Sequence, residues 1–167
     1  MTTPDDRADN GVAPDQSPAV DREIANILIV EQDADCADAL EAILADLPGI
    51  ATVQTAETTG DALSLLNDAE DDVVGFGIAC VIPPAPDVIF IGADQPDSND
   101  VAFELLQTLT TLRRRVPDAS IVLLCVYPSQ YRDVLGDLID GCIRKDTSAR
   151  ELHMLIDDLR AAHVYER

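Results

Sequence analysis

Reactive side chains follow four apolar runs of the sequence, at the point where each run ends. They belong to three short segments and one lysine: Glu31-Gln32-Asp33, Gly92-Ala93-Asp94, Cys125-Val126 and Lys145. If the runs are parallel strands, their carboxyl ends meet at one edge of a sheet, where ligands bind in doubly wound α/β domains. Carboxylates, a thiol and an ammonium gathered there could bind a charged ligand. Lys145 is the only lysine of the chain, beside ten arginines.

The cysteines do not indicate a metal site. They are widely spaced along the chain, at Cys36, Cys80, Cys125 and Cys142, with no C-x-x-C pair and no histidine close by. Zinc sites need closely spaced ligands. We therefore expect reduced, mostly buried thiols, as in cytosolic proteins generally.

Strand-like and helix-like patterns alternate along the chain. Apolar runs predict five strands, at residues 27–30, 50–55, 88–91, 121–126 and 142–143. Apolar residues at helical spacing follow each strand, and Ser148 and Glu151 form a capping box that marks the start of the last helix. This alternation predicts the α/β class, with a doubly wound five-stranded parallel sheet and helices on both faces.

The length of 167 residues suits one domain. Residues 1–23 are rich in Pro, Asp, Ala and Gly and have few large apolar side chains, so they predict a disordered acidic tail. Residues 24–162 form the domain and residues 163–167 its C-terminal end. Within the domain, residues 70–84 are less regular and predict an irregular or extra strand.

The formal net charge is −21. Such a surface repels phosphate backbones and anionic lipids, which argues against nucleic-acid and membrane partners. No apolar run is long enough to cross a membrane, and the N-terminus lacks the pattern of a signal peptide, so a cytoplasmic location is expected. The acidity fits a salt-adapted surface and an ordinary solvated exterior equally well.

Four segments, in this order, resemble the receiver domain of response regulators. They are the opening ILIVEQD, the third strand PDVIFIGADQP, the fourth strand PDASIVLLCV and the closing DGCIRKDTSARELHMLI. The resemblance covers residues 25–162, with residues 70–84 as an apparent insertion. It implies a flavodoxin-like, receiver-type fold and a role in two-component regulatory systems, that is, in phosphorelay signal transduction.

The resemblance also shows how far the active site has drifted. In receivers a carboxylate accepts a phosphoryl group, Mg²⁺ held by carboxylates neutralises charge, and a hydroxyl and a lysine hold the phosphate. The acceptor Asp lies four residues before a loop proline, which here places Gly92 before Pro96, and glycine has no nucleophile. The remaining positions are the acidic pair, matched by Glu31 and Gln32; the hydroxyl, matched by Cys125; the aromatic switch, matched by Cys142; and the lysine, retained as Lys145.

The resemblance therefore implies a pseudo-receiver with no catalytic residues, no cofactor and no metal, in which Lys145 is the structural partner of Glu31. Our leading hypothesis is a stand-alone protein-interaction module that is not an enzyme and works without phosphorylation. Its partner would be a histidine kinase, another regulator or a second copy in a homodimer, docked on residues 131–162. Because the sequence ends five residues after Ala162, we expect no DNA-binding output domain.

Two alternatives stay open. One is a conventional phosphoreceiver that uses a displaced acid such as Asp94, although that shift would move the buried strand out of register. The other is a thiol-based sensor built on Cys125 and Cys142. We expect these cysteines at opposite ends of neighbouring strands, with Cα atoms beyond the roughly 7 Å limit for a disulfide. We therefore favour simple replacement of a hydroxyl and an aromatic ring by small apolar side chains.

Overall fold

The computed structural model describes residue 24 and residues 26–71, 84–93 and 99–165. Five parallel strands form one sheet in the order β2-β1-β3-β4-β5. The strands are β1 (Asn26–Val30), β2 (Thr52–Ala56), β3 (Val88–Gly92), β4 (Ser120–Cys125) and β5 (Gly141–Arg144). This confirms the predicted α/β class and its flavodoxin-like sheet. The strand order reverses between β1 and β3, so the switch point, where such sheets bind ligands, lies between their carboxyl ends.

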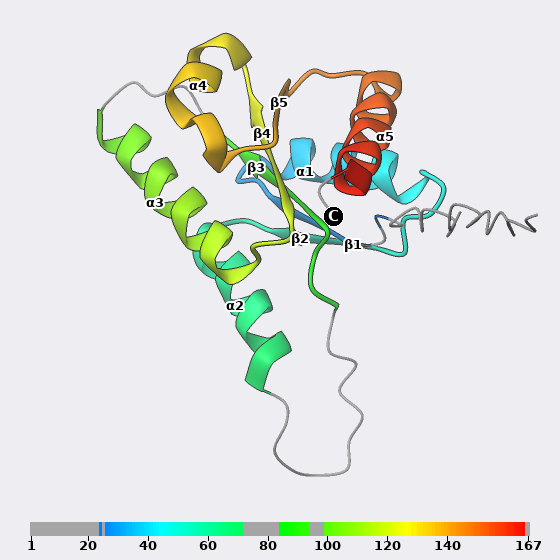
Figure 1. The fold of residues 1–167 in the computed structure, drawn as a ribbon, viewed down its shortest axis with the longest axis horizontal. Coiled ribbons are helices and arrows are strands. Elements are labelled where there is room, and N and C mark those ends of the chain that lie inside the picture. The colour runs from blue at the N-terminus through cyan, green and yellow to red at the C-terminus, as the bar shows by residue number, and fades with distance from the viewer. Residues whose placement is uncertain (1–23, 25, 72–83, 94–98, 166–167) are drawn as a thin grey trace, which may run out of the picture.

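Helices cover both faces of the sheet (Figure 1). They are α1 (Ala34–Ala45), α2 (Thr59–Asp71), α3 (Asn99–Arg115), α4 (Pro128–Leu135) and α5 (Ala149–Tyr165). Buried residues of α1 and α5 join one core cluster, and buried residues of α2, α3 and α4 join the other. The sheet thus has a layer of helices on each side, as the alternating pattern predicted.

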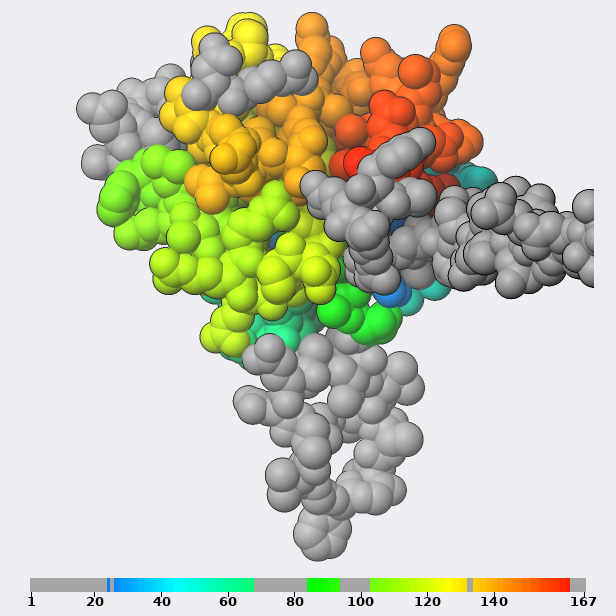
Figure 2. Space-filling model, in the orientation of Figure 1, coloured from blue at the N-terminus to red at the C-terminus, as the bar shows by residue number. Residues whose placement is uncertain are grey.

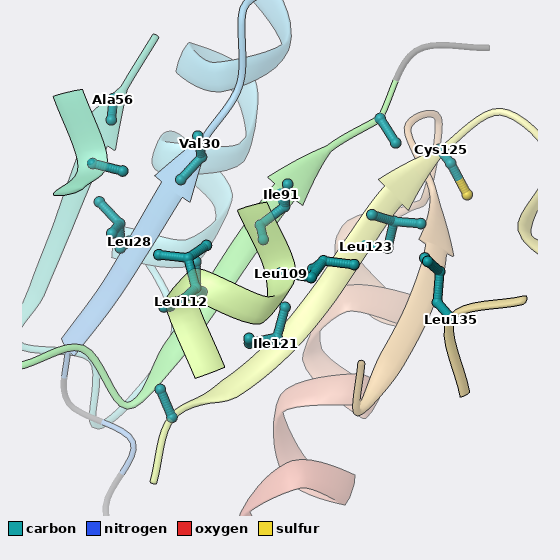
Figure 3. Packing of buried hydrophobic residues seen from close by; sticks show 14 of the residues in the cluster. Leu28, Val30, Ala56, Ile91, Leu109, Leu112, Ile121, Leu123, Cys125 and Leu135 are labelled. Atoms are coloured by element: carbon teal, nitrogen blue, oxygen red, sulfur yellow. The ribbon is translucent and has the colours of Figure 1, made fainter. Parts of the chain in front are cut away.

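The central strands are buried on both faces. Leu28 and Val30 of β1 belong to the cluster under α2, α3 and α4, whereas Ile27 and Ile29 belong to the cluster under α1 and α5. All residues of β4 are buried. Figure 3 shows the first of these clusters, with Leu109 of α3 packed over the sheet. The central strands are continuous apolar runs because helices cover both faces of the sheet, so neither face of these strands is turned toward water.

The two predicted helix signals of the last third have different outcomes. The capping box is confirmed: Ser148 Oγ accepts a hydrogen bond from the backbone N–H of Glu151, and Glu151 Oε2 accepts one from the N–H of Ser148 at 2.9 Å. After the fourth strand, apolar residues at helical spacing run from Tyr131 to Ile139 and predict a helix through Ile139. The helix ends sooner, at Leu135, and a 3-10 turn follows. Gly136 has a φ of 44°, a left-handed conformation that glycine adopts without strain and that stops a helix.

Other predicted boundaries differ by a few residues. The second strand begins at Thr52 instead of residue 50, and α2 runs on to Asp71. The predicted tail, residues 1–23, lies outside the described residues, as does most of the apparent insertion. No helix of the described residues has both the length and the apolar character that a bilayer span requires.

Arg113 joins the end of α3 to the sheet. Its guanidinium donates to the carbonyl oxygen of Ala119 at 2.7 Å and pairs with Asp140. Positive side chains at the end of a helix also interact favourably with its dipole. Arg113 therefore has a structural role at the junction of α3 with the sheet.

Candidate functional site

The carboxyl ends of four strands meet at one edge of the sheet. Glu31 directly follows β1, Gly92 ends β3, Cys125 ends β4 and Lys145 directly follows β5. Backbone hydrogen bonds continue the strand ladders one step beyond their ends, because Glu31 N–H donates to the carbonyl of Ala56 and Lys145 N–H to that of Cys125. The positions of these residues are thus fixed by the sheet itself.

A buried ion pair links the first and last of these strands. Lys145 Nζ donates to Glu31 Oε1 at 2.9 Å, and the same oxygen accepts a hydrogen bond from the backbone N–H of Asp33 at 3.1 Å. The Glu31 side chain is 2% exposed and the Lys145 side chain 19%. Burial of a carboxylate without a positively charged partner would lower the stability of the fold. The Lys145 ammonium supplies that partner for Glu31. The contact between Glu31 and Lys145 that we predicted is present.

Gly92 lies beneath the same carboxylate. A Cβ atom at position 92 would overlap Glu31 Oε2 and would stand 2.6 Å from its Cδ, which is closer than real Cβ atoms come to other heavy atoms. The other strand glycine, Gly141, would give its Cβ only ordinary contacts at 3.5 Å or more. The Glu31 side chain therefore occupies the volume into which a residue 92 side chain would project.

The second oxygen of Glu31 is held differently from the first. Oε2 is buried and has no hydrogen-bond partner among the described residues. A buried polar atom without a partner lowers stability. Its position therefore follows from the ion pair and the hydrogen bond that hold Oε1, together with the space that Gly92 leaves.

The residues of this edge do not fit a magnesium ion. Gln32 is exposed, and its amide is neutral. Glu31 Oε1, the best placed oxygen, is already bound to the Lys145 ammonium, which opposes a cation at that atom. Mg²⁺ requires several hard oxygen ligands in near-octahedral arrangement, and the described residues contain no group of three or more His, Cys, Asp or Glu that could hold a metal. Asp94, the alternative acceptor, lies outside the described residues.

The sulfur atoms of the two cysteines lie closer together than we expected. Cys125 Sγ and Cys142 Sγ lie 3.3 Å apart. The four-residue strand β5 pairs with the second half of β4, so that Cys142 stands opposite Leu123, two residues before Cys125. Cys125 ends β4 and Cys142 lies near the start of β5, as we expected. Because β5 is short and pairs with the end of β4, the two residues are nevertheless diagonal neighbours. Figure 3 shows Cys125 at the edge of the core cluster.

The environment of Cys125 favours the protonated thiol. Burial raises the pKa of Cys125 to about 12, and the hydrogen bond and the charge of Cys142 add to the rise. The charge of Lys145 acts in the opposite direction, and the backbone N–H of Lys145 donates to the carbonyl oxygen of Cys125 at 3.1 Å. The cysteine pair and the ion pair are thus neighbouring features of one edge.

Sequence reasoning missed two features of this region. One is Asp33, whose backbone N–H binds Glu31 and whose side chain caps α1 by accepting from Cys36 N–H at 3.2 Å. An Asp just before a helix is a sequence signal for an N-cap.

The second missed feature is a pocket of about 470 Å³. It is lined by residues of α4, β5 and α5, among them Cys142 and Glu151. No local sequence pattern predicts this pocket.

Comparison with known proteins supports the fold. No family model and no curated protein sequence matches the chain. Among solved structures, a CheY-like response regulator receiver domain from Methanospirillum hungatei JF-1 is similar at a TM-score of 0.62 and 20% identity, over 86% of this chain and 99% of that one. A LuxR family DNA-binding response regulator from Silicibacter pomeroyi is similar at a TM-score of 0.60 and 19% identity. The match covers 83% of this chain and 93% of that one.

A third similar structure is the response regulator protein TrrA from Thermotoga maritima, in complex with Mg²⁺ and BeF. It gives a TM-score of 0.56 at 20% identity, over 81% of this chain and 98% of that one. At these identities the likeness establishes a shared fold, the receiver-type sheet with its helices.

Proposed function

We propose that this chain is a pseudo-receiver, a receiver-type domain that serves as a phosphorylation-independent protein-interaction module in two-component signal transduction in the cytoplasm. The observation that carries the proposal is the position of the Glu31 carboxylate, which fills the space above Gly92 and binds Lys145. In this reading Glu31, Gln32, Gly92, Cys125 and Lys145 are degenerate active-site positions, and Cys142 is the degenerate switch position.

The ion pair supplies the reason why phosphorylation is not needed. In a phosphoreceiver the lysine holds the phosphoryl group after transfer. Here Lys145 Nζ already pairs with a carboxylate of the same domain, at 2.9 Å. The lysine therefore has its partner without any phosphoryl group.

The surface of α4, β5 and α5 is the proposed docking face. These elements lie together at one end of the molecule (Figure 2). Val134 of α4 is 67% exposed and Met154 of α5 is 56% exposed, and both are large apolar side chains. The proposed partner is a histidine kinase, another regulator or a second copy of the chain. The net charge of −21 disfavours nucleic acid and anionic membranes.

Phosphorylation chemistry tests the proposal directly. The chain is incubated with acetyl phosphate and Mg²⁺ and its intact mass is measured, beside a phosphorylatable receiver treated in the same way. We expect no added phosphoryl group on this chain. A stoichiometric adduct that disappears in Asp94→Asn would overturn the proposal and establish the conventional phosphoreceiver instead.

A further inference from the structure

We propose that Cys125 and Cys142 form a reversible disulfide, and that this bond changes the surface built by α4 and β5. The chain would then carry an oxidation-sensitive site in addition to its proposed role as an interaction module. This inference depends on the two sulfurs and not on Glu31, Gly92 or Lys145, so its failure would leave the proposed function intact.

The positions of the sulfur atoms carry the inference. Both residues are reduced thiols, and their Sγ atoms lie 3.3 Å apart. A disulfide is about 2.05 Å long, so the sulfurs need to approach by roughly 1.3 Å. Each sulfur ends a short side chain on a neighbouring strand, and the strands pair in parallel, with Cys142 opposite Leu123. Diagonal neighbours have Cα atoms about 7–8 Å apart, close to the roughly 7 Å limit for a disulfide. Closing the bond therefore takes side-chain rotation together with a small backbone shift, without a change of register.

The two thiols differ in their access to solvent. Cys125 is fully buried, whereas Cys142 is half-buried and lines the pocket of about 470 Å³ together with Pro128, Arg144 and Glu151. A small oxidant can therefore reach Cys142 through the pocket, whereas Cys125 is buried and does not line it. This asymmetry assigns the roles: Cys142 reacts first, and Cys125 completes the disulfide.

The reaction can be written with a hydroperoxide as the oxidant. The Cys142 thiolate attacks the terminal oxygen, the O–O bond breaks, and the departing alkoxide takes a proton, which leaves a sulfenic acid on Cys142. The Cys125 thiolate then attacks the Cys142 sulfur, the S–O bond breaks and the hydroxide leaves as water. The two thiols lose two electrons and two protons in total, and the peroxide is reduced to an alcohol and water.

The surroundings of Cys125 favour this order of steps. Burial and the hydrogen bond with Cys142 raise the pKa of Cys125 to about 12, so this thiol keeps its proton near neutral pH. Cys142, which is less buried, is therefore the first nucleophile. In the second step the proton of Cys125 goes to the departing hydroxide, which leaves as water.

The disulfide would alter the start of α4. Cys142 Sγ donates to the carbonyl oxygen of Pro128, the first residue of α4, at 3.8 Å, and Cys125 Sγ lies 3.8 Å from the carbonyl oxygen of Ile143. Oxidation removes both S–H donors and draws Cys142 toward β4. It therefore releases a contact at the beginning of α4 and reshapes one wall of the pocket.

The experiment uses the full chain with Cys36→Ser and Cys80→Ser, which leaves only the two proposed thiols. The protein is treated with hydrogen peroxide at several protein concentrations, unfolded in the presence of N-ethylmaleimide, and weighed as an intact chain. We expect the loss of two hydrogens and no maleimide adduct, at a rate independent of protein concentration, and recovery of both thiols after dithiothreitol. The wild-type chain is treated in parallel and its cross-linked peptides are mapped, so the result does not depend on the folding of the variant.

Two further measurements distinguish the roles of the cysteines. A variant that also carries Cys125→Ser should retain a sulfenic acid on Cys142 that reacts with dimedone. Amide hydrogen exchange over residues 128–138 should differ several-fold between the oxidised and reduced chain. Full maleimide labelling of both thiols after peroxide treatment, or disulfides only between chains, would overturn the proposal. Unchanged exchange in the oxidised chain would overturn its link to α4.

Discussion

The carboxylate of Glu31 and the backbone of Gly92 are complementary, because the side chain of one fills the space left by the missing side chain of the other. A Cβ at position 92 would overlap Oε2 of Glu31. The pair joins the ends of β1 and β3, at the switch point of the sheet. The consequences of this fit can be measured through stability.

Gly92→Ala should lower the free energy of unfolding by about 2 kcal/mol, because the new methyl group overpacks the site against Glu31. Urea denaturation followed by circular dichroism gives the value. Gly141→Ala is the matched control: it also lies in a strand, its Cβ would meet only ordinary contacts, and we expect an effect at most half as large. If the site is organised as described, Glu31→Ala combined with Gly92→Ala costs less than the sum of the single changes. Strict additivity would contradict the fit.

Lys145→Met should lower the free energy of unfolding by about 2–4 kcal/mol, because it leaves the buried Glu31 carboxylate without its partner. Arg144→Met serves as the control, since Arg144 and its partner Asp146 are both exposed and such pairs contribute about 0–1 kcal/mol. The double variant with Glu31→Gln should recover much of the loss. Equal effects of the Lys145 and Arg144 changes would contradict the burial of the pair.

The Cys125 thiol makes stability depend on pH in the alkaline range. The pKa of Cys125 is about 12 in the folded chain, above the value of about 8.5 expected for an unfolded chain. The unfolded state therefore releases this proton first as the pH rises. The contribution of the thiol is fully present below about pH 8.5 and is lost progressively toward pH 12.

This dependence can be isolated by comparison with Cys125→Ala. Urea denaturation at pH 7, 8, 9 and 10, with reductant present, should show that the stability advantage of the wild-type chain over the variant shrinks as the pH rises. All other titrating groups are common to both proteins. A difference that stays constant, or that grows with pH, would be inconsistent with a buried neutral thiol.

Ser148→Ala should lower the free energy of unfolding by about 1 kcal/mol, the usual value of a helix N-cap. The change removes the acceptor for the N–H of Glu151 and leaves that donor without a protein partner. Ser64→Ala is the control, since Ser64 is an exposed helix residue that bonds back to the carbonyl of Gly60, and alanine is favoured there. An unchanged free energy of unfolding in Ser148→Ala would argue against the capping box.

The sequence predicted best those features that depend on local pattern. The strands β1, β3 and β4 are continuous apolar runs because both faces of the sheet are covered, and their predicted positions agree with the structure to within one residue. The contact of Lys145 with Glu31 was also predictable, since parallel strands bring all their carboxyl ends to one edge.

The features that escaped prediction depend on geometry between elements. The end of α4 depends on the left-handed φ of Gly136, and a glycine in a polar stretch does not reveal its φ. The proximity of Cys125 and Cys142 depends on the register of β5 against β4, which a strand of four residues does not encode by itself. Likewise, no pattern reveals that the Glu31 side chain turns toward Gly92.

The contact between Asp140 and Ile121, at the opposite edge of the sheet, has a consequence for the sulfur pair. Asp140 Oδ2 accepts from the N–H of Ile121 at 2.7 Å, and the N–H of Asp140 donates to the carbonyl of Ile121 at 2.8 Å. These two bonds set the alignment of β5 as it enters the sheet, and a slip by one residue would turn Cys142 to the other face. The meeting of the two thiols is thus decided by an aspartate that contacts neither sulfur and lies two residues before Cys142. A lineage that lost this aspartate could keep both cysteines and still lose their chemistry.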